Sequence, residues 1–268
     1  MIAQAFRRWK HARRIRAAEA EIAARSFTPK PHGLDAPLVV SLTSFGPRLP
    51  VVGKVLQSLL RQTVRPDRVI LWLTEADAGL LPEEVRTLGA EIRTCPNWKS
   101  YKKIVPTLLE APDAYIVTAD DDVYYGPDWL AGLVARAGAG VVCHRGHRIG
   151  LKDGQPRPYG GWDWNIGAPA AGPLIFPTGV GGVLYAPGIF HPDVTDAGKF
   201  TRLAPSADDV WLYWMHRLRG SRPEKVGGKF RVVEWPGSQT QNLRGGNLGS
   251  GGNDRALQAM IAEYGWPE

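Results

Sequence analysis

The stretch from Tyr115 to Tyr125, which reads YIVTADDDVYY, most constrains the fold. It begins with an apolar run rich in β-forming residues, and three carboxylates, Asp120, Asp121 and Asp122, follow at once. A continuous apolar run bounded by polar residues is typical of a strand buried on both faces. The carboxylates are then expected at the carboxyl end of that strand, where ligands bind in open α/β sheets.

These acids favour a metal site. Three adjacent carboxylates repel one another, so the cluster is costly unless a cation neutralises it. Asp120 and Asp122 alternate on an extended backbone and should point to the same side. Hard oxygen ligands suit Mn²⁺ or Mg²⁺, ions that usually also hold a substrate phosphate. The plainer alternative is an acidic turn in solvent, since Asp is common in turns.

The flanking sequence predicts an α/β fold. Strands are expected at 38–42, 68–73, 91–95 and 115–119, and helices at 51–62, 82–89, 100–110 and 127–138. Strands that alternate with helices at this spacing imply a mostly parallel, Rossmann-like sheet with helices on both faces. The loops after the first two strands then place Thr43, Ser44, Thr74 and Glu75 at the ligand-binding edge.

The amino-acid composition changes in the second half of the chain. Residues 146–192 are dense in glycine, proline and aromatics, and are expected to form irregular ligand-facing structure. Trp162 and Trp164 flank Asp163; such rings can stack on a sugar, although they also fill ordinary cores. A helix is expected at 207–220, and the plainer interpretation of Asp208 and Asp209 is that they serve only its N-terminus. A strand at 231–235, a mobile glycine-rich run at 239–254 and a helix at 253–265 follow.

The N-terminus carries most of the net charge. Residues 1–25 hold seven Lys or Arg and two Glu, hence +5 of the total of +7, and the nearly neutral remainder argues against nucleic-acid binding. We expect a basic helix at 1–26 and a linker at 27–36. Phe6 and Trp9 lie three residues apart among these cations, so the helix either lies on an anionic membrane surface or is solvated and packs one weak stripe on the body.

Bulk features predict a cytoplasmic protein, either free or peripheral on the inner face of the cytoplasmic membrane. The sequence has no apolar run of the ~20 residues that a membrane span needs, and no signal-peptide pattern. Its two cysteines, Cys95 and Cys143, do not make a disulfide framework in a chain of 268 residues.

Together these elements resemble the GT-A glycosyltransferases, especially bacterial family-2-like and Fringe-like members. The resemblance covers about residues 37–220. It implies one catalytic domain at 37–268, with a nucleotide-sugar-binding half at 37–145 and an acceptor-binding half at 146–268. TADDDVYY is similar to the DXD motif, which implies that Asp120 and Asp122 hold the metal and that Asp121 lies in the donor site. SYKK resembles the preceding basic position, so Lys102 or Lys103 would meet the donor.

Motifs in the second half of the chain also resemble the acceptor side of the GT-A glycosyltransferases. TGVGGVLYAPG resembles a glycine loop that would place Gly181 and Gly182 at the acceptor, beside Trp162 and Trp164. ADDVW resembles the acidic motif that supplies the catalytic base. This chain has Asp208-Asp209 where relatives have Glu-Asp, and the resemblance favours Asp209, with Asp208 as the other candidate.

The implied reaction moves a sugar, with inversion, from a UDP-sugar to a saccharide or lipid-linked saccharide, in bacterial surface polysaccharide synthesis. Two other classes stay open. An apolar strand followed by Asp-x-Asp also fits a HAD-like phosphatase, but Tyr124 stands where that pattern needs Thr or Val. A non-catalytic carbohydrate-binding protein would explain the tryptophans but not two separate acid clusters.

Overall fold

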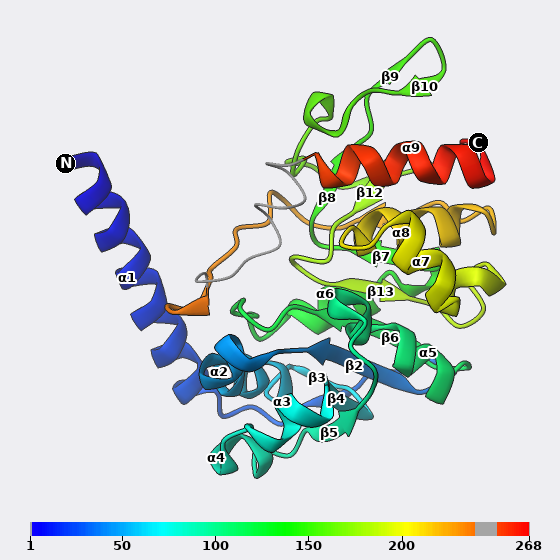
Figure 1. Ribbon diagram of the computed structural model, residues 1–268. Helices are drawn as coiled ribbons and strands as arrows, with labels where there is room; N and C mark the ends of the chain where they lie inside the picture. Colours follow the sequence, from blue (N-terminus) through cyan, green and yellow to red (C-terminus); the bar gives the residue numbers. More distant parts are fainter. Residues whose placement is uncertain (1, 239–250, 268) are drawn as a thin grey trace.

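The computed structural model describes residues 2–238 and 251–267 (Figure 1). In this part of the chain the central sheet has eight strands, in the order β11-β14-β7-β13-β6-β2-β4-β5. Their bounds are β2 (Leu38–Thr43), β4 (Arg68–Leu73), β5 (Glu91–Thr94), β6 (Tyr115–Ala119), β7 (Val141–Cys143), β11 (Ala170–Ala171), β13 (Val183–Tyr185) and β14 (Glu224–Lys225).

The sheet is mostly parallel. Strands β5, β4, β2 and β6 all run in one direction, and Leu42 of β2 pairs with Leu71 on one side and Ala119 on the other. Strand β13 runs antiparallel to both of its neighbours, β6 and β7. The predicted mostly parallel sheet with flanking helices is therefore confirmed.

Short strand pairs and helices surround this sheet. The pairs are β1 (Lys30–Pro31) with β3 (Val64–Arg65), β8 (Gly146–Arg148) with β12 (Ile175–Pro177), and β9 (Leu151–Lys152) with β10 (Gln155–Pro156). The α-helices are α1 (Ile2–Ala24), α2 (Leu49–Leu60), α3 (Glu75–Gly79), α4 (Glu83–Arg86), α5 (Val105–Glu110), α6 (Trp129–Val134), α7 (Ala197–Leu203), α8 (Asp208–Arg217) and α9 (Gly252–Tyr264). The 3-10 helices are η1 (Gly46–Arg48), η2 (Lys99–Lys103), η3 (Ala137–Ala139), η4 (Tyr159–Gly161) and η5 (Pro192–Thr195).

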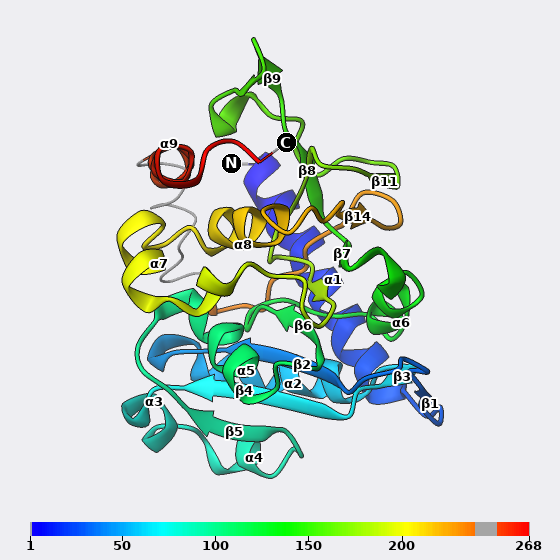
Figure 2. The ribbon, with the colours of Figure 1, turned by 90° about the vertical axis from the view of Figure 1, so that its right-hand side faces the viewer.

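Alternation along the strands divides the core between the two faces of the sheet. On one face, Val40 and Leu42 of β2 pack in a cluster with Val52 and Val55 of α2. On the other face, Ile116 of β6 belongs to a cluster that also contains residues of α5, α8 and α9. Figure 2 shows α2 and α5 on opposite sides of the sheet. Because both faces are covered, the strands are apolar along their whole length, as expected for buried parallel strands.

Two predicted elements are wrong in form. The helix expected at 100–110 breaks at Ile104 into η2 and α5, since Pro106 lies in the first turn of α5, where its missing N–H is not needed. The segment 231–235 is not a strand. It lies beside the acidic turn instead, where Tyr124 N–H donates to the Val233 carbonyl and Trp235 N–H donates to the Asp122 carbonyl.

Other boundaries shift by a few residues. Helices α4 and α6 are shorter than expected, whereas α1, α8 and α9 match their predicted positions closely. Most of the glycine-rich run predicted to be mobile, residues 239–250, lies outside the described residues. Both cysteines are free thiols. Of the helices in the described ranges, none combines the length and apolarity that crossing a membrane requires.

Candidate active site

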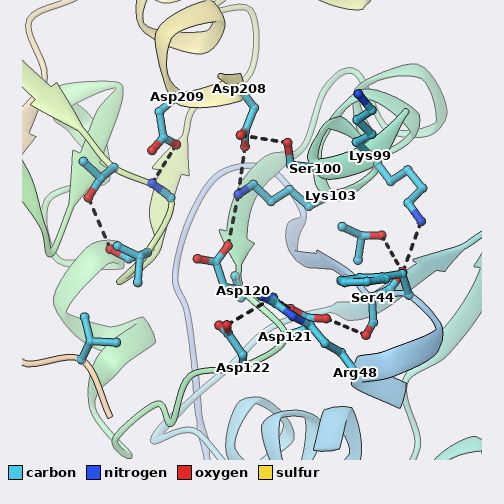
Figure 3. Close-up of a pocket in the computed structure, with 18 of the residues that line it drawn as sticks. Ser44, Arg48, Lys99, Ser100, Lys103, Asp120, Asp121, Asp122, Asp208 and Asp209 are labelled. Atoms are coloured by element: carbon cyan, nitrogen blue, oxygen red, sulfur yellow. Dashed lines mark hydrogen bonds and ion pairs between the residues drawn. The ribbon is translucent and has the colours of Figure 1, made fainter. Parts of the chain in front are cut away.

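A cavity of about 720 Å³ opens at the carboxyl ends of β2 and β6 (Figure 3). Its floor is formed by the loop after β2, by η2 and by the acidic turn after β6, and the facing wall by the start of α8 and the segment after β12. The volume lies in the range of ligand-binding clefts, roughly 300–1,000 Å³. The sheet edge predicted from the strand order is therefore the edge that holds the cavity.

Basic and hydroxyl side chains hold the three carboxylates of the acidic turn. Asp121 is buried and accepts hydrogen bonds from Ser44 Oγ at 2.6 Å and from Arg48 Nη1 at 2.7 Å. Asp122 approaches the same Arg48 Nη1 atom with its Oδ2 atom, whereas Asp120 lies 3.1 Å from Lys103 Nζ (Figure 3). The expectation that Asp120 and Asp122 share a side stays a prediction, and Asp121 fastens the turn to the β2 loop.

Negative charge is concentrated around Asp122. Its Oδ2 atom lies 3.2 Å from Arg48 Nη1. Burial, together with the charges of Asp120, Asp121 and Glu234, raises the pKa of Asp122 to about 7, although Arg48 acts to lower it. Burial also lowers the pKa of Arg48, but the acids more than offset this, so that its pKa is raised overall. A single guanidinium thus leaves this part of the cavity short of positive charge.

A second pair of acids faces the turn from the start of α8. Asp208 accepts a hydrogen bond from Ser100 Oγ at 2.9 Å, and its other carboxyl oxygen lies 3.0 Å from Lys103 Nζ. Asp209 accepts the Gly179 backbone N–H at 2.9 Å. Neither acid caps α8, because Ala207 holds the N-cap position and the helix has no side-chain cap bond. The interpretation of these acids as helix caps alone is therefore wrong.

Lys103 joins the two acid clusters. Its Nζ atom lies 3.1 Å from Asp120 Oδ1 and 3.0 Å from Asp208 Oδ2, and the side chain is buried. Burial lowers the pKa of Lys103, but Asp120, Asp208 and Asp209 overcome this and raise the pKa well above its usual value. Lys103 is therefore charged at neutral pH.

Asp209 has the environment of a proton acceptor. Burial and repulsion from Asp208 raise its pKa to about 7, although Lys103 and the Gly179 N–H act to lower it. The residue lines the cavity and is only partly exposed. A carboxylate whose pKa is close to neutral can accept a proton at neutral pH and release it again.

The remaining donor-side residues fall into two groups. Thr43 and Lys102 line the cavity; Thr43 Oγ1 donates to the Trp72 carbonyl at 2.7 Å, and Lys102 Nζ donates to the Ser44 carbonyl at 3.2 Å. Thr74 and Glu75 lie outside the cavity lining. Thr74 caps α3 by accepting the Asp77 N–H, and Glu75 accepts a hydrogen bond from Thr94. Their expected place at the nucleoside is therefore not supported by their position.

On the acceptor side, the structure separates the two tryptophans. Trp164 lines the cavity and stacks on His147, with ring centroids 5.1 Å apart. Trp162 is buried against Tyr159 and Phe176, and its Nε1 donates to the Arg157 carbonyl at 2.9 Å. Because it is only 5% exposed and is not among the cavity-lining residues, Trp162 belongs to the core and not to the cavity wall.

The glycine loop reaches the cavity through a different glycine than expected. Gly181 and Gly182 lie outside the cavity lining. Gly182 has a φ of +91°, and a Cβ there would lie 2.3 Å from the Trp129 ring, so this glycine permits close packing. Gly179 is the glycine beside the cavity. The acceptor-binding expectation for Gly181 and Gly182 is replaced by a structural role.

Sequence reasoning missed several cavity residues. They are Arg48, Ser100, Tyr159 and Gly179. Arg48 lies in a loop whose glycine and prolines suggested only a turn, and Ser100 in a segment that suggested only a helix start. No local pattern pairs them with acids that lie 73 and 108 positions away. Of these residues, the sequence pattern indicated only Gly179, because it lies in the glycine loop TGVGGVLYAPG.

The carboxylates of the acidic turn supply part of a ligand set for a divalent metal ion. No three His, Cys, Asp or Glu side chains within residues 2–238 and 251–267 surround a common point suited to an ion. Asp120 and Asp122 nevertheless both line the cavity, and the pKa of Asp122 is raised by burial and by the neighbouring acids, a penalty that a cation would offset. Mg²⁺ and Mn²⁺ accept one or two carboxylates, with water and phosphate oxygens as the other ligands. Asp120 and Asp122 therefore fit a divalent metal ion.

No family model matches the sequence, and no curated protein matches it. Solved structures match in fold. A mannosyltransferase from Pyrobaculum calidifontis, solved with GDP-Man and Mn²⁺, aligns with a TM-score of 0.57 and 14% identity, over 95% of this chain and 70% of that chain. This similarity shows that the chain has the GT-A-like fold.

Two other solved structures align less well. A 4-diphosphocytidyl-2C-methyl-D-erythritol synthase aligns over 87% of this chain and 100% of its own, with a TM-score of 0.45 and 16% identity. Glucosyl-3-phosphoglycerate synthase from Mycobacterium tuberculosis, solved with Mn²⁺, UDP and glucosyl-3-phosphoglycerate, aligns over 41% of this chain and 43% of its own, with a TM-score of 0.31 and 16% identity. Both scores are too low to support an inference.

Proposed function

We propose that this protein is a metal-dependent glycosyltransferase that moves a sugar from a nucleotide-sugar to a hydroxyl of a saccharide or lipid-linked saccharide. One observation carries the proposal. Two acid clusters from different parts of the fold, Asp120 with Asp122 and Asp208 with Asp209, line one cavity at the carboxyl edge of a GT-A-like sheet. One cluster suits a diphosphate-bound cation and the other a proton-accepting base, and sugar transfer requires both chemistries.

The donor is assigned to the floor of the cavity. Asp120 and Asp122 would hold Mn²⁺ or Mg²⁺, which, when bound, neutralises the diphosphate so that it can leave. Thr43 and Ser44, at the end of β2, lie beside Asp121 on the same floor and are assigned to the nucleoside. Lys102 and Lys103 add positive charge to the phosphate region. We propose a UDP-sugar as the donor, on the basis of the sequence resemblance.

Asp209 is assigned as the base. It accepts the proton of the acceptor hydroxyl while that oxygen attacks the anomeric carbon and the bond to the nucleoside diphosphate breaks. Its pKa of about 7 allows this near neutral pH. Lys103, which contacts both clusters, holds Asp208 and Asp120 in place during the reaction. A base opposite the leaving group implies direct displacement and therefore inversion at the anomeric carbon.

The acceptor is assigned to the aromatic wall. Trp164 and Tyr159 line the cavity together with His147, on which Trp164 stacks. Burial lowers the pKa of His147 to about 3, so this imidazole is neutral. Flat uncharged rings suit the C–H face of a sugar, which favours a saccharide over an anionic acceptor at this wall.

A nucleotide-release screen tests this proposal. Purified protein is mixed with a panel of nucleotide-sugars and simple saccharide acceptors, with Mn²⁺ or with EDTA, and free nucleoside diphosphate is measured. Metal-dependent release from one donor class, lost in Asp209→Asn, is the expected result. Hydrolysis of a generic phosphomonoester with no nucleotide release would favour the phosphatase alternative. Saccharide binding with neither activity would favour a non-catalytic carbohydrate-binding protein.

A further inference from the structure

Helix α1 is fixed to the domain through its C-terminal half. Ile15, Ala18 and Ile22 are buried in the same core cluster as α2. Just after the helix, Arg25 donates hydrogen bonds to three backbone carbonyls, those of Ser58, Arg61 and Tyr125. Figure 1 shows this end of α1 beside α2. The helix is therefore an attached element of the domain.

The attachment leads directly to the acidic turn. Glu21 of α1 accepts a hydrogen bond from the Tyr124 hydroxyl at 2.7 Å. The neighbouring Tyr125 accepts, through its hydroxyl oxygen, the backbone N–H of Asp120 at 2.7 Å. Because the C-terminal half of α1 contacts the residues that follow the acids, the direction of the helix is fixed relative to the cavity.

The N-terminal half of α1 presents aromatic side chains to solvent. Phe6 and Trp9 are each 52% exposed, and their rings stack with centroids 6.0 Å apart. Lys10 Nζ lies 4.4 Å from the centroid of the Phe6 ring, and the Arg13 guanidinium lies 5.9 Å from that of Trp9. Two large apolar rings side by side at the surface form an exposed apolar patch of the kind that marks an interaction site, and the cation–π contacts keep the basic side chains beside it.

The charge of this half is of one sign. It carries six cations, Arg7, Arg8, Lys10, Arg13, Arg14 and Arg16, and the first acid in the chain is Glu19. These basic side chains lie on exposed residues of the helix. The remainder of the protein beyond residue 25 is close to neutral, with 26 basic and 24 acidic residues. The basic charge is thus localised to the exposed half of one helix.

We propose that residues 2–16 of α1 dock on an anionic lipid bilayer surface, independently of the function proposed for the cavity. The aromatic pair would enter the headgroup region and the six cations would meet acidic headgroups, a combination typical of interfacial helices. A bilayer fits better than a nucleic acid, because the rings stack on each other and present apolar surface that a phosphate backbone does not cover. Docking would orient the cavity relative to the membrane, since α1 is fixed to the acidic turn.

Vesicle sedimentation with matched variants tests the proposal. Phe6→Ser/Trp9→Ser removes the aromatic pair, and Leu80→Ser/Leu109→Ser removes exposed apolar side chains elsewhere on the surface. Arg7→Gln/Arg13→Gln removes two charges from α1, and Arg219→Gln/Arg222→Gln removes two exposed charges from another region. All four variants alter exposed residues, so their melting temperatures should match that of the wild type. Deleting the whole helix would be a poorer test, because it also removes Ile15, Ala18 and Ile22 from the core.

The wild type should sediment with phosphatidylglycerol-containing vesicles and not with pure phosphatidylcholine. Both α1 variants should lose about tenfold or more of their partition coefficient, whereas both control variants should bind like the wild type. Equal binding to the two vesicle types, or full binding by either α1 variant, would overturn the proposal. Displacement of the wild type from the vesicles by a short RNA duplex, added at a concentration below that of the accessible lipid, would also overturn the proposal.

Discussion

Lys103 Nζ lies 3.0 Å from a carboxyl oxygen of Asp208, and this contact joins two halves of the protein that are 105 positions apart in sequence. The same ammonium lies 3.1 Å from Asp120. One buried cation therefore holds the acidic turn and the start of α8 at a fixed separation. A single lysine thus couples the proposed donor side to the proposed acceptor side.

Removing this cation should cost both stability and activity. In Lys103→Met, Asp120 and Asp208 lose a buried partner, and breaking a buried ion pair from one side typically costs about 3–5 kcal/mol. We expect a lower melting temperature and a fall in kcat, with partial rescue by Lys103→Arg, which keeps the charge. Lys99→Met, on the cavity rim, is the control. A Lys103→Met variant as stable as the wild type would show that the contact is not maintained.

Asp209→Asn should separate activity from stability. Loss of a general base lowers turnover by about two orders of magnitude or more, and donor binding should persist. The folded-state pKa of Asp209, about 7, lies above its ordinary value, so the folded protein binds the proton more tightly than the unfolded chain does. This group therefore destabilises the fold increasingly as pH rises from about 4 to 7.

The amide variant lacks this penalty. It should melt about 2 °C or more above the wild type at pH 8, with a difference that shrinks toward pH 4. Wild-type turnover should fall as pH drops below about 7, because Asp209 becomes protonated. Calorimetry and a pH–rate profile measure the two effects. A product with the anomeric configuration of the donor, or near-normal turnover by Asp209→Asn, would remove Asp209 from the role of base.

Arg48 should tune the metal site through Asp122. Its guanidinium lowers the pKa of Asp122, so Arg48→Met should raise that pKa further and shift metal binding to higher pH. We expect Mn²⁺ affinity, measured by electron paramagnetic resonance, to fall more at pH 6.5 than at pH 8.5. Arg145→Met, across the cavity, is the control. An affinity loss that is the same at both pH values would contradict the electrostatic explanation.

Gly182 provides a test of its structural role. In Gly182→Ala the new methyl group would meet the Trp129 ring, and the backbone has a positive φ, so we expect destabilisation by about 2–4 kcal/mol. Gly160→Ala adds a methyl group into open space and should change stability little. Chemical denaturation compares the two. A stable Gly182→Ala variant with weakened acceptor binding would restore the acceptor-binding interpretation of this glycine.

The sequence predicts the buried strands well, because their apolar character extends over both faces. The second strand, Arg68–Leu73, appears with the predicted bounds, and so does Tyr115–Ala119. Residues 231–235 were mispredicted because β-forming composition does not reveal whether a partner strand exists; their neighbour is the acidic turn. Local pattern is thus sufficient for long buried strands, and it does not reveal short ones such as β14, although β14 pairs with two other strands.

The candidate site was predicted less completely. Asp120, Asp122 and Asp209 could be singled out because each lies at the end or start of a predicted element. The contacts that set their environment come from residues distant in sequence, such as Arg48, Ser100 and Lys103, and no periodicity encodes such pairs. Trp162 and Trp164 are chemically alike, and only the packing of the chain decides which one reaches the cavity.

Calorimetric binding of UDP and GDP, with Mn²⁺ and with EDTA, tests the central claim most directly. We expect the wild type to bind one of these nucleotides at least about tenfold more tightly with Mn²⁺, since the metal would join the diphosphate to Asp120 and Asp122. Asp122→Asn should lose most of this metal-dependent gain, and Asp209→Asn should keep it. Equal nucleotide affinity with and without metal in the wild type would contradict the account.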